Sequence, residues 1–243
     1  MSTREPIFNA PSVVVILMGM FIAIHIGGQI ISVADEEWLL LALALIPERY
    51  TDFGPQIPGH PWAEFTSPIT HMFLHGDFVH LAMNTAWFLA VGTVAARRLG
   101  SARLIIAFIA SGLAGAALFI AANPGERVVM IGASGAISGL MAIVLRLLFS
   151  AKSPELRWLL TADPRLVPRS GLLELLQDRR AMIVIGIWIA LNLVFAFGWS
   201  NVLVDGKIAW EAHLGGFFCG LLLFGAIDPG PGRKDEERLA MDA

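Results

Sequence analysis

The chain has 243 residues, of which 56% are hydrophobic and 15% are charged, with a formal net charge of −3. Soluble domains carry about 25% charged residues, and the mean hydropathy of +0.69 excludes an ordinary soluble domain and predicts a polytopic membrane protein with one membrane domain. No basic block indicates a nucleic-acid partner, and the single cysteine, Cys219, excludes an intrachain disulfide and a cysteine-based zinc site.

A helix needs about 20 mostly apolar residues to cross the bilayer core. Six segments of the chain qualify, and they are 12–32, 68–94, 103–122, 132–150, 181–199 and 209–227. The first apolar run is too long for a signal peptide and no small-residue cleavage site follows it closely, so we expect it to be a retained span. The sequence therefore predicts an all-α membrane protein, a bundle of six transmembrane helices.

Positive residues are unevenly divided between the two sides that six spans create. With the N-terminus inside, thirteen of the 17 Lys and Arg residues lie on or beside inner segments and three lie on outer ones. Because inner loops are enriched in Lys and Arg, we expect both termini inside, as in a bacterial inner membrane protein. The expected domains are a short cytoplasmic N-terminus at 1–11, the membrane domain at 12–227 and a disordered cytoplasmic tail at 228–243.

Two connecting segments are long enough to carry structure of their own. The outer loop at 33–67 has interrupted apolar patches and aromatic residues suited to the headgroup level, so we expect short helices partly embedded in the outer leaflet. An ordinary surface loop is the alternative. In the inner loop at 151–180, Ser170 is placed to cap a short amphipathic helix on the membrane surface.

Polar side chains inside the spans are costly there, so each is a functional candidate. They are His25, Gln29, His71, His75, His80, Asn84, Ser134, Ser138, Asn192 and His213. The second, fourth and sixth spans all enter the bilayer from outside. Four of these residues therefore fall together in the outer half of the bilayer, and they are His80, Asn84, Ser134 and His213.

Ser134 and His213 are candidates for a catalytic pair. A serine becomes a nucleophile when a base within hydrogen-bond distance takes its proton. Small residues allow two helices to approach closely, and they flank both positions at Gly135, Gly139, Ala212, Gly216 and Gly220. This spacing is compatible with helix packing alone as well as with catalysis. No acidic residue lies in the middle of a span, and Glu211 leaves its helix on a different face, so the residues allow a Ser-His dyad.

Acyl transfer also requires hydrogen-bond donors for the developing oxyanion. His80 and Asn84 are four residues apart and share a helix face, while Ser134 at a helix N-terminus offers its own backbone N–H. The alternative for His80 and Asn84 is structural, as interhelical hydrogen bonds. These residues with His213 lack the carboxylates or thiolates of hydrolytic zinc sites, so we expect no metal and no cofactor.

Three short motifs fall in order on the second, fourth and sixth spans: "HLAMN" at 80–84, "GASG" at 132–135 and "AHLGG" at 212–216. Together they resemble the rhomboid family of intramembrane serine proteases, over about residues 12–227. The resemblance implies a serine endopeptidase that cleaves transmembrane helices of single-pass or polytopic membrane proteins near the outer face of the bilayer, through an acyl-enzyme. It implies no oligomeric state.

The same resemblance implies a role for each site residue. Ser134 would be the nucleophile and His213 the general base, with Asn84, His80 and the backbone N–H of Ser134 at the oxyanion. Neighbouring small residues would support this arrangement, and they are Gly132, Gly135, Ser138 and Gly216. The outer loop at 33–67 would border the site.

The chain departs from the family pattern at three positions. Ala63 follows Trp62 where several relatives have Trp-Arg, and Ala96 stands where many have an acidic residue before an arginine. Both changes concern structural anchoring. Ser138 occupies the place of an aromatic residue that often lies against the histidine ring, so His213 needs another orienting group, and the Ser138 hydroxyl is a candidate.

Two other functions compete with proteolysis. The alternative within the family is a catalytically inactive rhomboid-like protein that binds membrane helices, but such proteins typically lose the serine or the histidine, and this chain has both. A transporter or channel would require charges along a pathway through the bilayer and repeated halves. The sequence has neither feature.

Overall fold

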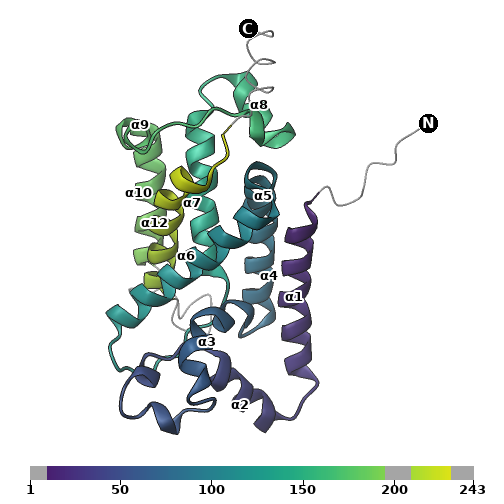
Figure 1. Ribbon diagram of the computed structural model, residues 1–243, viewed down its shortest axis with the longest axis vertical. Coiled ribbons are helices and arrows are strands. Elements are labelled where there is room, and N and C mark those ends of the chain that lie inside the picture. The colour runs from purple at the N-terminus through teal and green to yellow at the C-terminus, as the bar shows by residue number, and fades with distance from the viewer. Residues whose placement is uncertain (1–9, 195–208, 231–243) are drawn as a thin grey trace, which may run out of the picture.

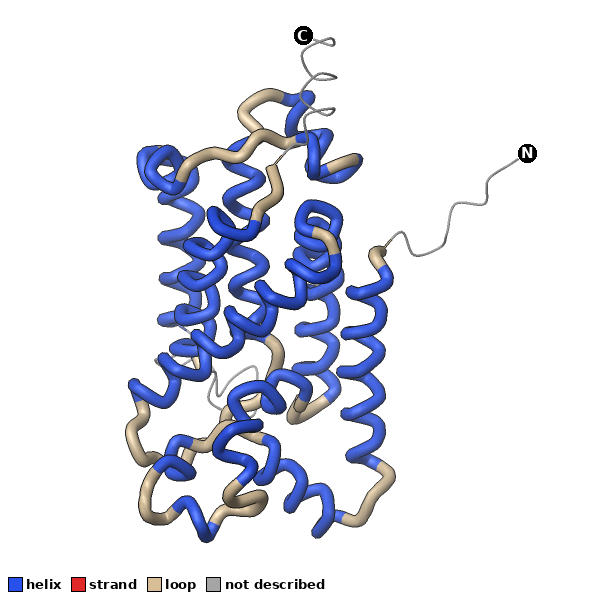
Figure 2. The backbone as a smooth tube through the Cα atoms, viewed as in Figure 1, coloured by secondary structure: helices blue, strands red, loops and turns tan. Residues whose placement is uncertain are grey.

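The computed structural model describes residues 10–194 and 209–230, and within them every regular element is a helix (Figure 2). In this described part of the chain, four helical segments are long and apolar enough to cross a membrane. Their bounds are α1 Ser12–Gln29, α4 Phe78–Trp87 continuing through a π-helical turn at Phe88–Gly92 into α5 Thr93–Leu99, α6 Ser101–Ala122 and α12 Trp210–Ile227. The first, third and fourth of these agree with predicted spans in position and length, and the second overlaps the span predicted at 68–94.

The other two predicted spans correspond to shorter helices. The segment predicted at 132–150 is α7, Ser134–Ser150, which is apolar but has only 17 residues. The segment predicted at 181–199 is α10, Arg179–Val194, and residues 195–199 lie outside the described part of the chain. In Figure 1, α1 and α4 lie on one side of the bundle and α10 on the other, with α6, α7 and α12 between them.

The second span begins ten residues later than predicted. The chain at 68–77 belongs instead to the end of α3, Trp62–Thr70, to a 3₁₀ turn at His71–Phe73 and to a loop. The Asp77 side chain accepts the backbone N–H of His80 at 2.8 Å and caps the new helix. Because an N-cap residue satisfies the first free N–H groups, the helix begins at Phe78.

The segment at 33–67 forms short helices, as predicted. They are α2 Val33–Leu43, 3₁₀ turns at Pro47–Tyr50 and Gly54–Gln56, and α3. Arg49 is their centre, because its side chain is 1% exposed and donates to the backbone carbonyls of Pro58, at 2.9 Å, and Leu41. Several relatives have an arginine after the tryptophan of this loop, but here Ala63 follows Trp62, so the sequence does not show which residue anchors the loop. Arg49 supplies a buried guanidinium from another turn of the same loop.

The helices α6, α7 and α12 are packed backbone to backbone. A Cβ added to Gly216 would overlap the carbonyl of Gly135, and one added to Gly220 would overlap the carbonyl of Gly139. The structure thus brings together the two small-residue faces that the sequence indicated on α7 and α12. Such contact allows helices to come closer than the usual 8–10 Å between axes.

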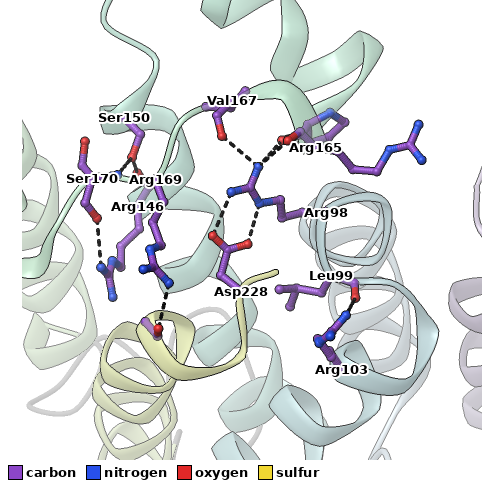
Figure 3. Close-up of polar contacts among 12 residues, drawn as sticks. Arg98, Leu99, Arg103, Arg146, Ser150, Arg165, Val167, Arg169, Ser170 and Asp228 are labelled. Atoms are coloured by element: carbon purple, nitrogen blue, oxygen red, sulfur yellow. Dashed lines mark hydrogen bonds and ion pairs between the residues drawn. The ribbon is translucent and has the colours of Figure 1, made fainter. Parts of the chain in front are cut away.

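At the end of the bundle opposite α2 and α3, arginine side chains connect the helices through hydrogen bonds and an ion pair (Figures 1 and 3). Arg98 of α5 forms a fully buried ion pair with Asp228, at 2.6 Å from Nε to Oδ1. The same guanidinium donates to three backbone carbonyls of the connecting segment, and they belong to Pro164, Arg165 and Val167. The disorder expected from residue 228 therefore does not include Asp228, because its carboxylate is needed by a buried cation.

Two further arginines hold the same connection, which contains α8 Pro154–Ala162, a 3₁₀ turn at Pro164–Leu166 and α9 Leu172–Gln177. Arg146 of α7 donates to the carbonyls of Leu221 and Ser170, and Arg169 donates to that of Gly225. Ser170 does not cap α9 as expected. Gly171 is the N-cap residue, and its N–H donates to the Glu174 carboxylate at 3.1 Å.

Candidate active site

Ser134 is the first residue of α7 and is preceded by a tight turn. Gly132 in that turn has φ +109°, a conformation that favours glycine. Its N–H donates to the carbonyl of His71 at 2.9 Å, so the loop before α4 holds the turn in place. The serine is thus presented at a helix N-terminus, where the backbone N–H groups of the first turn have no partners within the helix.

His213 is the fourth residue of α12, and its Nε2 lies 2.8 Å from the Oγ of Ser134. The two side chains are half-buried and come from elements 79 residues apart. The helices allow this contact because Gly135 lies against α12: a Cβ there would be 3.1 Å from the carbonyl oxygen of Ala212. At 2.8 Å the imidazole is positioned to accept the serine proton.

The other ring nitrogen of His213 is bonded to α10. Its Nδ1 lies 2.7 Å from Oδ1 of Asn192, and Nδ2 of Asn192 donates to the carbonyl of Trp188 at 2.9 Å. From the sequence, Asn192 was only one of several polar residues in spans, without a partner. The sequence offers one signal that His213 needs a neutral partner. No acidic residue lies in the middle of a span, so no carboxylate is available there to accept a proton from Nδ1.

Ser138 does not orient His213. Its hydroxyl donates to the carbonyl of Ser134, one turn earlier in the same helix, at 2.7 Å. A serine inside a helix commonly satisfies its hydroxyl in this way. The position where relatives often have an aromatic ring is therefore occupied by a small side chain that is bonded to its own helix.

His80 and Asn84 lie beside the turn that carries the serine. A Cβ at Gly132 would be 2.7 Å from Nε2 of His80 and 3.9 Å from Nδ2 of Asn84. One hydrogen of the Asn84 amide is donated to the His80 carbonyl, at 3.0 Å. The second hydrogen remains available, since an amide nitrogen carries two. The four residues that the sequence placed in the outer half of the bilayer are thus gathered around one glycine turn.

His71 and His75 lie close by but contact other partners. His71 is buried, with Nδ1 2.9 Å from the carbonyl of Ser67. His75 is also buried, between Phe21 and His80, and its carbonyl lies 2.9 Å from Nδ1 of His25. Among the described residues no three His, Cys, Asp or Glu side chains are arranged to hold a metal ion.

The apolar helices and the polar cluster at one end of them define the class of this chain, an integral membrane protein with an all-α bundle. The rhomboid-domain family model matches residues 62–227, which include every residue of the candidate site. The chain therefore belongs to the rhomboid family, as the three motifs indicated.

One bacterial protein is similar to this chain over two thirds of its length. The rhomboid protease GluP of Bacillus subtilis (strain 168) is 31% identical over 162 residues, which cover 67% of this chain. The same region covers 26% of the relative, so the chain spans about a quarter of the length of the protein it matches.

Proposed function

We propose that this chain is an intramembrane serine endopeptidase that cleaves transmembrane helices of membrane proteins near the outer face of the bilayer. The observation that carries the proposal is the 2.8 Å contact between Ser134 Oγ and His213 Nε2. Support also comes from the family match and from a relative that is named a protease. Ser134 is the proposed nucleophile and His213 the general base.

The reaction proceeds in two proton-transfer stages. His213 takes the proton of Ser134 as the oxygen attacks the scissile carbonyl, and then gives it to the leaving amine. Water hydrolyses the acyl-enzyme with the same histidine as base. The negative charge on the tetrahedral intermediate is stabilised by the backbone N–H of Ser134, the free amide hydrogen of Asn84 and the ring of His80.

In the proposed topology, six helices span the membrane with both termini inside, as in a bacterial inner membrane. The arginine-rich end, with Arg98, Arg146 and Arg169 (Figure 3), is then cytoplasmic, and the N-terminus of α7, where Ser134 lies, faces outward. This assignment is supported by the excess of Lys and Arg on one side of the bundle. A substrate is a single-pass or polytopic membrane protein whose helix unwinds near its outer end, because an intact helix hides its carbonyls in hydrogen bonds.

Fluorophosphonate labelling of the purified protein tests the proposal. The wild type is expected to be labelled, whereas Ser134→Ala and His213→Ala are not. Ser138→Ala is the matched control, because it removes a neighbouring hydroxyl that is bonded to its own helix, and it is expected to retain labelling. Labelling that persists in Ser134→Ala contradicts the assignment of the nucleophile. A wild type that neither reacts nor cleaves a membrane-embedded substrate supports the inactive helix-binding alternative.

A further inference from the structure

We infer that Asn192 is a positioning residue for His213, so that the site is a serine–histidine–asparagine triad rather than a dyad. The inference rests on the proposed function. It starts from the chain of contacts from Ser134 Oγ to His213 Nε2 at 2.8 Å and from His213 Nδ1 to Asn192 Oδ1 at 2.7 Å. Both ring nitrogens of the histidine are therefore bonded, one to each neighbouring helix.

The orientation of the Asn192 amide follows from its other contact. The carbonyl of Trp188 only accepts hydrogen bonds, so the atom facing it at 2.9 Å is the NH₂ group. A flipped amide would place two oxygens against each other. The Oδ1 atom then faces His213, and it also only accepts, so Nδ1 carries the proton. In the neutral ring Nε2 is left unprotonated and accepts from Ser134, as a general base must.

A second contact holds the two helices in this register. The ring of Trp188, one turn before Asn192, stacks on the ring of Phe217, one turn after His213, with centroids 4.3 Å apart and planes at 19°. Asn192 is itself 9% exposed. The stack and the hydrogen bond thus join the same faces of α10 and α12, and the aromatic pair limits rotation of α10 away from the histidine.

No other described side chain competes for this role. Ser138 is bonded to the carbonyl of Ser134, and Glu211 accepts from Asn123 at 3.3 Å. A carboxylate in the middle of a span would be costly to bury. The neutral carbonyl of an amide avoids that cost and still accepts the Nδ1 proton, in the ground state and in the imidazolium that forms during attack. This accounts for an active-site arrangement without an acidic residue.

The direct test compares Asn192→Ala with Asn192→Asp and with the control Leu191→Ala, whose side chain lies next to Asn192 but is 51% exposed. Each purified protein is measured for fluorophosphonate labelling rate, for kcat and KM on a membrane-embedded peptide, and for thermal stability. Asn192→Ala is expected to lower kcat and the labelling rate about 10- to 100-fold, the effect of removing a hydrogen bond to a charged group, with KM within about twofold. Asn192→Asp, which keeps an acceptor at this position, is expected to recover part of the rate, and Leu191→Ala to match the wild type.

The tautomer provides a readout that a structural role would not change. In ¹⁵N-histidine-labelled wild type, the His213 signals are identified by their loss in His213→Ala, and they are expected to show Nδ1 protonated and Nε2 unprotonated. In Asn192→Ala this preference is expected to weaken. Wild-type kcat in Asn192→Ala, or a wild-type ring protonated mainly at Nε2, overturns the inference. If Asn192→Ala does not fold, the wild-type spectrum and the activity of Asn192→Asp still test the inference. A wild type that is never labelled overturns the proposed function instead, and the proposed triad with it.

Discussion

Gly216 of α12 lies so close to Gly135 of α7 that a methyl group on Gly216 would overlap the Gly135 carbonyl. The proposed catalytic pair depends on this contact, because Ser134 adjoins Gly135 in α7 and His213 lies one turn before Gly216 in α12. A displacement of one helix by the size of a methyl group would break the 2.8 Å hydrogen bond. Packing and the proposed chemistry are therefore properties of the same interface.

Gly216→Ala is accordingly expected to lower both stability and labelling by fluorophosphonate. Overpacking of a dense contact costs about 1–3 kcal/mol, and the shift of α12 separates the reacting atoms. The matched control is Gly19→Ala in α1, where an added Cβ meets no atom within 4 Å. Thermal unfolding in detergent and labelling rates measure the two effects. Equal behaviour of the two variants would contradict the close approach of α7 and α12.

Arg49→Ala is expected to loosen the loop at 33–67. The substitution leaves the carbonyls of Leu41 and Pro58 without their buried donor, and each unsatisfied group costs about 1–3 kcal/mol. Limited proteolysis is expected to cut the variant faster within 33–67. Arg127→Ala is the control, because it removes a cation whose side chain is 68% exposed. Proteolysis of Arg49→Ala at the wild-type rate would show that other contacts hold the loop.

The buried pair of Arg98 and Asp228 is expected to stabilise the opposite end of the bundle. Removing one partner of a buried ion pair costs about 3–5 kcal/mol, because the other charge stays buried without compensation. Arg98→Ala and Asp228→Ala should each lower the melting temperature strongly, and the double variant should lose much less than the sum of the two. Lys152→Ala, which breaks an exposed pair with Glu174 at 4.0 Å, should be nearly neutral. Additive effects in the double variant would argue against direct coupling.

His75, which precedes the membrane-spanning helix at Phe78, is expected to make stability depend on pH. Burial, together with the nearby His80 and His25, lowers the pKa of His75 to about 4, from 6.5. The unfolded chain therefore binds more protons than the folded one between these values, and this contribution to stability is complete above pH 6.5 and is lost as pH falls to 4. Asp77, whose carboxylate caps the helix, also faces this region.

His75→Phe removes that titration and keeps a ring between Phe21 and His80. The melting temperature of the variant relative to that of the wild type, measured from pH 7.5 to 4.5, is expected to rise as the pH falls, because only the wild type loses this contribution. The carboxylates titrate in both proteins and cancel in the difference. A constant difference across the range would show that His75 is not the responsible group.

Much of the membrane domain could be predicted from local sequence. Hydropathy located four spans and the core of α7 and α10, since apolar runs of helix length are recognisable without a partner. The boundary before α4 is predicted ten residues early, because the 68–77 segment itself contains apolar residues that continue the span, and the capping role of Asp77 becomes evident only with the helix in place.

The candidate site was predictable where short motifs carried it. Ser134, His213, His80 and Asn84 were found through three motifs on three spans, and the structure gathers them around Gly132. The orienting partner of His213 was not predictable. Asn192 lies in an apolar helix and belongs to no motif. The sequence instead favours Ser138 as the group that orients His213, because it lies one turn after Ser134.

The amino-acid sequence by itself thus determined the class of protein, the helices and the residue types available for chemistry. Hydropathy, small-residue spacing and short motifs are local properties, and they need no knowledge of how one helix is rotated against another. The tertiary structure alone decided that Asn192 contacts His213, that Arg49 anchors the loop at 33–67 and that Arg98 pairs with Asp228. Hydrogen bonds are directional and short, so their partners depend on the rotation and depth of helices that lie far apart in the chain.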